Sequence, residues 1–426
     1  MFWTPASSAR AAFFGPWVIR AAFVLAIFGW GVGFYGPSVF LHAVVLRTEW
    51  SLSLVSSAVT LHYLFGALVV TQLPRLHRRF GVGPTAVAGA AITSLGVLGW
   101  ASAALPWQLF AAALASGGGW VTMGAVAVNA AIAPWYVRSR PWALARAYNG
   151  ASIGGVIFSP LWVALIASIG FTATAGIVGM VMVLVMVFLT LAVFSKSPEL
   201  LNQRPDGDAP GAAAPNVTLA HARALPGRAL WHDRSFLTLA AAMGLGLFAQ
   251  IGLIAHLFSL LVPAMGAQGA GWAMGFATAC AIVGRLVVGR AMPAGADRRW
   301  VAATSYAVQL AGSLVLLACS AQQIAWIWLG VALFGLGIGN ATSLPPLIAQ
   351  VEFVKEDVAR VVALIVAMAQ ATYAFAPAVL GAVLAASGGA HTQVGSGISG
   401  FMITVCSVQC LAIACLAWGR LAKRAG

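Results

Sequence analysis

The sequence predicts an all-α polytopic membrane protein with twelve transmembrane helices, arranged as two parallel six-helix repeats. Three observations predict this fold class. Only 8% of the 426 residues are charged and 61% are hydrophobic, whereas soluble globular domains carry about 25% charged residues. Apolar runs of about 20 residues, the length that crosses a bilayer, recur along the whole chain. The basic residues fall on alternate connections between these runs.

Each predicted helix is an apolar run bounded by Arg, Pro or Gly. The predicted spans are 17–44, 51–73, 85–105, 107–134, 143–168, 171–195, 236–263, 268–289, 301–320, 324–349, 359–386 and 396–419. The first run is too long for a cleaved signal peptide, so we expect it to remain as a helix.

The charge distribution tests the number of spans and orients them. With a cytoplasmic N-terminus, the cytoplasmic connections contain the basic residues Arg75, Arg78, Arg79, Arg138, Arg140, Arg290, Arg298, Arg299 and Arg420. The external connections contain only Arg47 and Glu49 as fixed charges. This asymmetry is the positive-inside rule, and one missed or extra helix would destroy it. We therefore expect both termini in the cytoplasm and a location in a bacterial-style inner membrane.

One long polar segment divides the chain. Residues 196–235 are rich in Pro, Gly and Ala and have no apolar period, which predicts a flexible cytoplasmic linker. It separates an N-terminal six-helix bundle, 1–195, from a C-terminal bundle, 236–426. The halves also share features, because "PRLHRRFG" and "GRLVVGRAMPAGADRR" are both basic turns after the second helix of a half. Two such repeats predict alternating access about a central cavity.

Composition excludes several other classes of protein. The net charge of +14 comes from scattered basic clusters without a recognition motif, which argues against a nucleic-acid partner. The five cysteines lie in apolar runs, with a spacing that suits neither zinc nor disulfides. The glycine-rich strings lack a phosphate-binding lysine, so no nucleotide cofactor is expected. No paired carboxylates or nucleophile–base set indicates an enzyme.

The basic turn at residues 74–81 resembles the G-x-L-x-D-R-x-G motif of the major facilitator superfamily. Pro74 and Arg78 stand where the motif has glycine and aspartate, which departs from the family's acidic–basic gate. The resemblance covers the whole chain and implies the twelve-helix fold of that family. It also implies a cytoplasmic gate at the matching residues Leu76, Arg79, Gly81, Arg140, Gly289 and Arg290.

Within the superfamily, the chain resembles the monocarboxylate and oxalate–formate transporter branch. The stretch "WYVRSRPWALARAYNGASIGGVIFSPL" is similar to that branch's pattern at its fourth and fifth helices, and "GRLVVG" to a segment whose arginine binds the substrate carboxylate. The resemblance places this role on Arg285. The chain departs from the branch because the spans 17–44 and 359–386 contain no lysine.

Arg285 has two interpretations from sequence. It lies five residues, or roughly 7 Å, from Arg290, so its side chain could extend to the membrane surface. Alternatively, it faces the cavity, where a cation without a protein counter-ion requires an anionic ligand. No Asp or Glu lies inside any span, which together with the resemblance favours an anion site.

Other polar side chains at mid-depth are Tyr35, Asn149, Gln370 and Tyr373, which we expect to orient the substrate if they do not simply join helices. His62, midway along its span, is a candidate proton relay, or a helix–helix hydrogen bond.

The sequence therefore predicts a monomeric secondary transporter of a small organic anion, with a monocarboxylate favoured, working by proton symport or anion exchange without a cofactor or metal. An exporter of drugs or neutral solutes, with a structural Arg285, is the first alternative. A membrane sensor that does not transport its ligand is the second.

Overall fold

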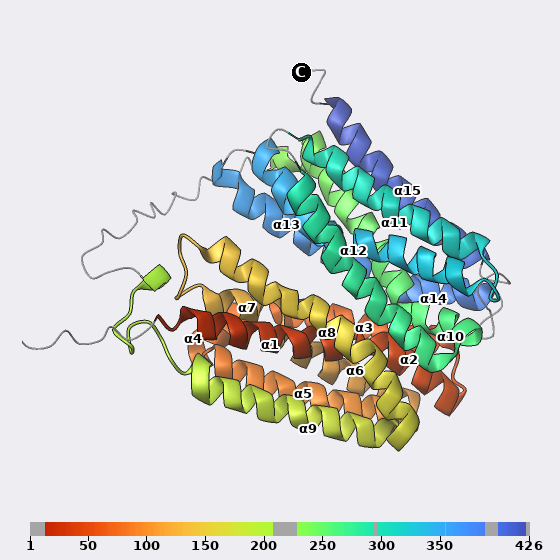
Figure 1. The fold of residues 1–426 in the computed structure, drawn as a ribbon, viewed down its shortest axis with the longest axis horizontal. Helices are drawn as coiled ribbons and strands as arrows, with labels where there is room; N and C mark the ends of the chain where they lie inside the picture. The colour runs from red at the N-terminus through yellow and green to blue at the C-terminus, as the bar shows by residue number, and fades with distance from the viewer. Residues whose placement is uncertain (1–12, 208–227, 293–295, 354, 388–398, 423–426) are drawn as a thin grey trace, which may run out of the picture.

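A computed structural model describes residues 13–207, 228–292, 296–353, 355–387 and 399–422. The described residues form helices and short connections, without a strand. The helices are gathered in two bundles, with α1 to α9 in one and α10 to α15 in the other (Figure 1). This arrangement is the all-α fold predicted from the apolar runs.

The N-terminal bundle contains six predicted spans, two of which are interrupted. Its helices are α1 (Gly15–Gly33), α2 (Gly36–Thr48), α3 (Leu52–Val70), α4 (Leu73–Phe80), α5 (Val82–Ser102), α6 (Pro106–Trp120), α7 (Ala125–Ile132), α8 (Arg140–Ile169) and α9 (Phe171–Leu189). One 3₁₀ turn joins α6 to α7 at residues 121–123, and one π turn extends α9 over residues 190–194. The short α4 connects two spans.

The C-terminal bundle is built from fewer but longer helices. They are α10 (Arg234–Ala291), α11 (Arg298–Ala318), α12 (Ile324–Glu352), α13 (Lys355–Ala374), α14 (Ala376–Ala386) and α15 (Ser399–Ala422). The 58 residues of α10 would extend about 87 Å, almost three times the roughly 30 Å of hydrocarbon in a bilayer.

A glycine divides α10 into two crossings. Gly266 has φ +71 within the helix, a left-handed conformation that glycine adopts without steric cost. The described part of the chain has eleven apolar segments long enough to span a membrane, and this division makes twelve crossings. The number predicted from sequence is therefore confirmed. The assignment of the two ends to the two sides of the membrane stays a prediction.

Prolines break two helices near the middle of the bundles. Pro37 follows the interruption between α1 and α2, and Pro377 follows the one between α13 and α14. Because proline cannot donate a backbone hydrogen bond inside a helix, it is favoured in a first turn such as these. Tyr35 lies at the first break, and Tyr373 lies two residues before Phe375 at the second.

The hydrogen bonds between the two bundles, within the described residues, lie between mid-depth and one end. We call the end where α1 begins and α15 ends the linker end, and the end where α2 and α14 finish the distal end. The bundles converge toward the distal end and diverge toward α7 and α13 (Figure 1). Toward the distal end, His42 bonds to Ser259 (3.2 Å) and Gln268 to Pro160 (3.5 Å), and near mid-depth the Ala378 N–H donates to the Thr60 hydroxyl (3.0 Å).

The first part of the predicted linker packs against the N-terminal bundle. The Asp206 carboxylate accepts hydrogen bonds from the backbone N–H groups of Val137 (3.0 Å), Arg138 (2.9 Å) and Ser139 (3.1 Å), and from the Ser139 hydroxyl. Ser139 precedes α8, so Asp206 caps that helix from a distant segment. Residues 208–227 of the predicted linker lie outside the described residues.

Replacing Asp206 with asparagine should loosen this contact. Burial raises the pKa of Asp206, but the four hydrogen bonds outweigh it and lower the pKa to about 2 from 3.8. Because the folded-state pKa is the lower one, the stabilisation is complete above the unfolded pKa and is lost as the pH falls through about 2. The contact should therefore persist unchanged between pH 5 and 8.

Asparagine keeps one acceptor oxygen but turns an NH2 group toward donors that the second oxygen accepted from, so the expected loss for Asp206→Asn is about 1 kcal/mol. Hydrogen exchange of the amides of residues 137–139 measures it, and these amides should exchange faster in the variant. Asp233→Ala, which removes the cap of α10 in the other bundle, is the control and should leave exchange at 137–139 unchanged. Equal exchange in Asp206→Asn and the unmodified protein would contradict the capping role.

Candidate functional site

Arg285 lies in the second crossing of α10, and its side chain is half-buried. Its Nε donates a hydrogen bond to the Gly339 carbonyl of α12 (3.3 Å). The guanidinium also lies close enough to Tyr35, in the other bundle, for the two groups to interact electrostatically. Within the described residues its Nη groups have no hydrogen-bond partner and no carboxylate pairs with it. A guanidinium with free Nη donors can bind a carboxylate through two parallel hydrogen bonds.

Three tyrosines lie close to one another, and one of them, Tyr35, interacts with Arg285. Tyr35 and Tyr63 come from the N-terminal bundle and are both 6% exposed. Tyr373 comes from the C-terminal bundle, with its ring 6.4 Å from that of Tyr63. Electrostatic interactions connect Tyr63 with both Tyr35 and Tyr373. We call Tyr35, Tyr63 and Tyr373 the tyrosine cluster, and it combines hydroxyl groups with an apolar aromatic surface.

Tyr35 and Tyr373 were predicted from the sequence as substrate-binding residues, but Tyr63 was not. The Tyr63 hydroxyl donates to the Phe34 carbonyl at the break between α1 and α2 (3.0 Å), so it holds Tyr35 in place from α3. The available signal was the adjacent "HY" pair at residues 62 and 63, because a tyrosine next to a mid-depth histidine lies at mid-depth as well.

The remaining candidate substrate-binding residues are placed differently. The Gln370 side chain lies close enough to Tyr373, three residues further along α13, to interact with its hydroxyl, so Gln370 belongs beside the tyrosine cluster. Asn149 is exposed and lies two turns of α8 before Val156, which contacts Gly275 of α10. Asn149 therefore lies on the face of α8 that meets the C-terminal bundle. It is nearer the linker end than the contact between Val156 and Gly275.

The expected gate residues lie at the linker end, on separate elements. Arg140 bonds back to its own segment, from Nε to the Tyr136 carbonyl and from an Nη to the Ala133 carbonyl, both at 3.0 Å. Leu76 and Arg79 are on α4, which ends at Gly81 with φ +85. Gly289 and Arg290 are exposed at the end of α10. In the described residues, no hydrogen bond connects any of these six to the other bundle.

A model of the Major Facilitator Superfamily matches residues 21–377, which is most of the chain. The chain belongs to this superfamily. It is therefore a multi-pass membrane transporter rather than an enzyme. No protein of curated function matches its sequence.

Solved structures of superfamily transporters share the fold over nearly the whole chain. The nucleoside transporter NupG matches with a TM-score of 0.69 and 12% identity, covering 95% of this chain and 98% of its own. A bacterial homologue of the human lysosomal transporter Spinster, in an inward-facing and occupied conformation, matches with a TM-score of 0.67 and 15% identity. That match covers 97% of this chain and 98% of the homologue. Identities this low establish a shared fold and do not extend to substrates.

His62, the candidate proton relay of this superfamily member, is enclosed within the N-terminal bundle. It is 1% exposed, its Nδ1 is 2.9 Å from the Ser116 Oγ, and its Nε2 is 2.9 Å from the Gly33 carbonyl. Both ring nitrogens are thus used to join three helices. This geometry favours the helix–helix interpretation of His62 over the relay.

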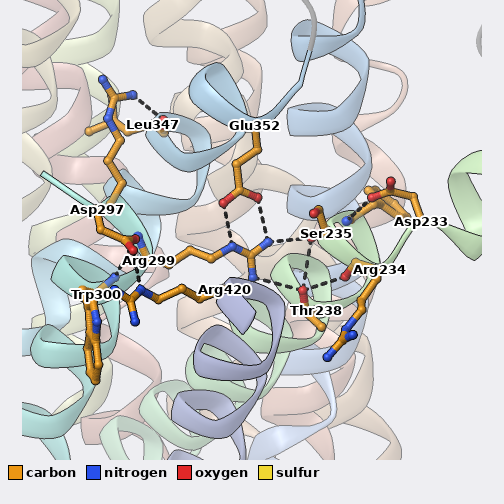
Figure 2. Close-up of polar contacts among 12 residues, drawn as sticks. Asp233, Arg234, Ser235, Thr238, Asp297, Arg299, Trp300, Leu347, Glu352 and Arg420 are labelled. Atoms are coloured by element: carbon orange, nitrogen blue, oxygen red, sulfur yellow. Dashed lines mark hydrogen bonds and ion pairs between the residues drawn. The ribbon is translucent and has the colours of Figure 1, made fainter. Parts of the chain in front are cut away.

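A buried ion pair in the C-terminal bundle was not singled out from the sequence. Arg299, at 2% exposure, points its guanidinium at the Glu352 carboxylate, with Nε–Oε1 2.7 Å and Nη2–Oε2 2.8 Å (Figure 2). The same guanidinium donates to the Thr238 hydroxyl (3.0 Å) and the Ser235 carbonyl (2.8 Å). One side chain therefore joins α10, α11 and α12 at the linker end.

A second ion pair lies beside it. Asp297 caps α11 by accepting from the backbone N–H groups of Arg299 and Trp300, and it pairs with Arg420 of α15 (Figure 2). Burial raises the pKa of Asp297, but hydrogen bonds and the charge of Arg420 lower it overall. The basic turn after the second crossing of α10 is therefore fixed to the bundle through its acidic residue.

Proposed function

We propose that the chain is a secondary transporter of small organic anions, with monocarboxylates as the favoured class. The observation that carries the proposal is Arg285, a guanidinium with free Nη groups beside residues of both bundles. No Asp or Glu in the described spans is placed to neutralise it, because Glu352 at the end of α12 is bound to Arg299. An anionic substrate is the partner that such a cation lacks.

The surroundings of Arg285 favour a single negative charge. One fixed cation balances one carboxylate, whereas a second carboxylate would meet only neutral groups. Tyr35, Tyr373 and Gln370 supply hydroxyl and amide groups that can hydrogen-bond a hydroxyl or keto oxygen next to the carboxylate. The aromatic rings would cover the apolar part of such a substrate. The exposed Asn149 is a candidate contact on the linker side.

The proposed mechanism is rocking of residues 1–195 against residues 236–426. The three hydrogen bonds between the bundles would break as the distal end opens, and a matching closure would form at the linker end. Enclosing Arg285 without a partner would bury an unpaired charge, whereas enclosing it with a bound anion would not. The substrate itself would thus lower the free-energy cost of the closed intermediate.

The way in which transport is coupled to a second solute follows from the lack of a free carboxylate in the described spans. In the described spans there is no free carboxylate to carry a proton, and both ring nitrogens of His62 are already hydrogen-bonded, so a proton would travel with the substrate. Exchange of one anion for another needs no protonatable side chain. We propose these two modes, proton symport and anion exchange, in the inner membrane.

The test is transport by purified protein reconstituted into liposomes. We expect counterflow of labelled lactate or pyruvate, weaker counterflow of the dianion oxalate, and none of a neutral nucleoside. Uptake that follows an imposed pH gradient would indicate symport, and uptake that requires an internal anion would indicate exchange. Counterflow of the nucleoside without any anion would overturn the proposal in favour of a neutral-solute carrier. Ligand binding without counterflow would indicate a sensor.

A further inference from the structure

A deep groove lies on the outer side of the N-terminal bundle, away from Arg285. It has a volume of about 550 Å³ and lies between α3, α4, α5 and α6. Small side chains create it, since Ala88 and Gly89 of α5 face Ala115 and Gly118 of α6 across its floor. Its lining is almost entirely apolar. In a bilayer, such a groove is open to lipid acyl chains.

The groove is as deep as one leaflet. It begins at the linker end beside Phe80 of α4 and continues along α5 from Pro84 to Ile92, a distance of about 12 Å. Half of the hydrocarbon thickness of a bilayer is about 15 Å. The groove therefore fits a chain that enters from the membrane surface and ends near the midplane.

Three arginines stand at the mouth of the groove without acidic partners. Arg75, Arg78 and Arg79 are exposed on α4, whose residues Leu76 and Phe80 line the groove. The Arg79 guanidinium lies 5.1 Å from the ring centroid of Phe80, and Arg75 donates to the Gln72 side chain (3.0 Å). Within the described part of the chain, no carboxylate forms an ion pair with any of the three. Guanidinium groups are well suited to bind phosphate.

We propose that this groove binds an anionic phospholipid, with an acyl chain along α5 and the headgroup phosphate at Arg75 and Arg79. Charge complementarity at the mouth selects the anionic headgroup, because arginines near a membrane surface attract anionic lipids. A second groove provides a comparison within the same molecule. It has a volume of about 450 Å³ and is lined by Trp272, Phe276, Ala279 and Trp328 among others, with no basic residue. The second groove should not discriminate between headgroups.

Native mass spectrometry of the purified protein tests the proposal, with phosphatidylglycerol and phosphatidylcholine of identical acyl chains. We expect phosphatidylglycerol to bind more tightly, and Arg75→Gln and Arg79→Gln each to weaken it about fivefold, from roughly 1 kcal/mol per arginine. Ala88→Phe fills the groove and should remove this binding. If the phenylalanine prevents folding, the smaller substitution Ala88→Leu is used in place of Ala88→Phe.

Two variants serve as matched controls. Arg20→Gln removes another exposed arginine that lies over an aromatic ring, that of Trp17, away from the groove. Ala279→Phe fills the second groove. Both should retain the preference for phosphatidylglycerol. Equal binding of the two lipids, or unchanged binding in both Ala88 variants, would overturn the proposal. So would an equal loss in Arg20→Gln and Arg79→Gln.

Discussion

Arg285→Gln should abolish transport of organic anions, and Arg285→Lys should retain only a small part of it. Glutamine preserves hydrogen bonding to the Gly339 carbonyl but removes the charge. Lysine keeps the charge but replaces the planar guanidinium, which offers two parallel donors, with an ammonium group that acts as a point charge. Because a hydrogen bond between charged groups contributes about 1.5–3 kcal/mol, loss of one donor should weaken substrate binding roughly ten- to hundredfold.

Initial rates of lactate or pyruvate uptake into proteoliposomes measure this effect. The lysine variant should show a raised KM, and the glutamine variant should show no saturable uptake. Arg20→Gln, which removes an exposed arginine at the linker end of α1, should transport at the normal rate. Melting temperatures of the variants show whether each is folded. Normal anion uptake by both folded Arg285 variants would exclude the anion site and leave Arg285 with a structural role at Gly339.

The number of crossings could be predicted from sequence because hydrophobic length and charge asymmetry are properties of the chain itself. The break at Gly266 did not disturb that number, since the uncharged turn "MGAQGAG" around it already separates two spans. The superfamily could also be predicted, because its motif at residues 74–81 is a short stretch of consecutive residues. The substrate branch depends on side chains that face a cavity, and it stays a prediction.

Contacts between helices distant in sequence could not be predicted. The helices here are apolar on every side, so the sequence does not show which face of α3 turns inward and brings Tyr63 to Tyr373. Arg285 was recognised because a charge in an apolar run is conspicuous, yet its partner Gly339 is 54 residues away on α12. Arg299 was assigned to a cytoplasmic connection, and the sequence does not indicate that Glu352 is its partner. Their pairing depends on how α11 packs against α12.

Glu352→Gln should be the most destabilising single change at the linker end of the C-terminal bundle. The Glu352 side chain is 9% exposed and that of Arg299 is 2% exposed, so the substitution leaves a buried guanidinium without its counter-charge. Breaking one partner of such a pair costs about 3–5 kcal/mol. Thr238 and Ser235 remain as acceptors but carry no charge to balance Arg299. The melting temperature should fall by roughly 6 °C or more.

The neighbouring pair gives the matched control for this prediction. Arg420→Gln breaks the ion pair with Asp297. The Arg420 side chain is 24% exposed and that of Asp297 is 40% exposed, so solvent already screens this pair. An exposed pair contributes about 0–1 kcal/mol, and the melting temperature should change little. Removing both charges of the buried pair, in Arg299→Met with Glu352→Leu, should recover much of the lost stability, because no unpaired charge is then left inside. If Glu352→Gln and Arg420→Gln lower the melting temperature equally, the buried pair does not hold α10, α11 and α12 together, and the bundle would depend on its apolar packing alone.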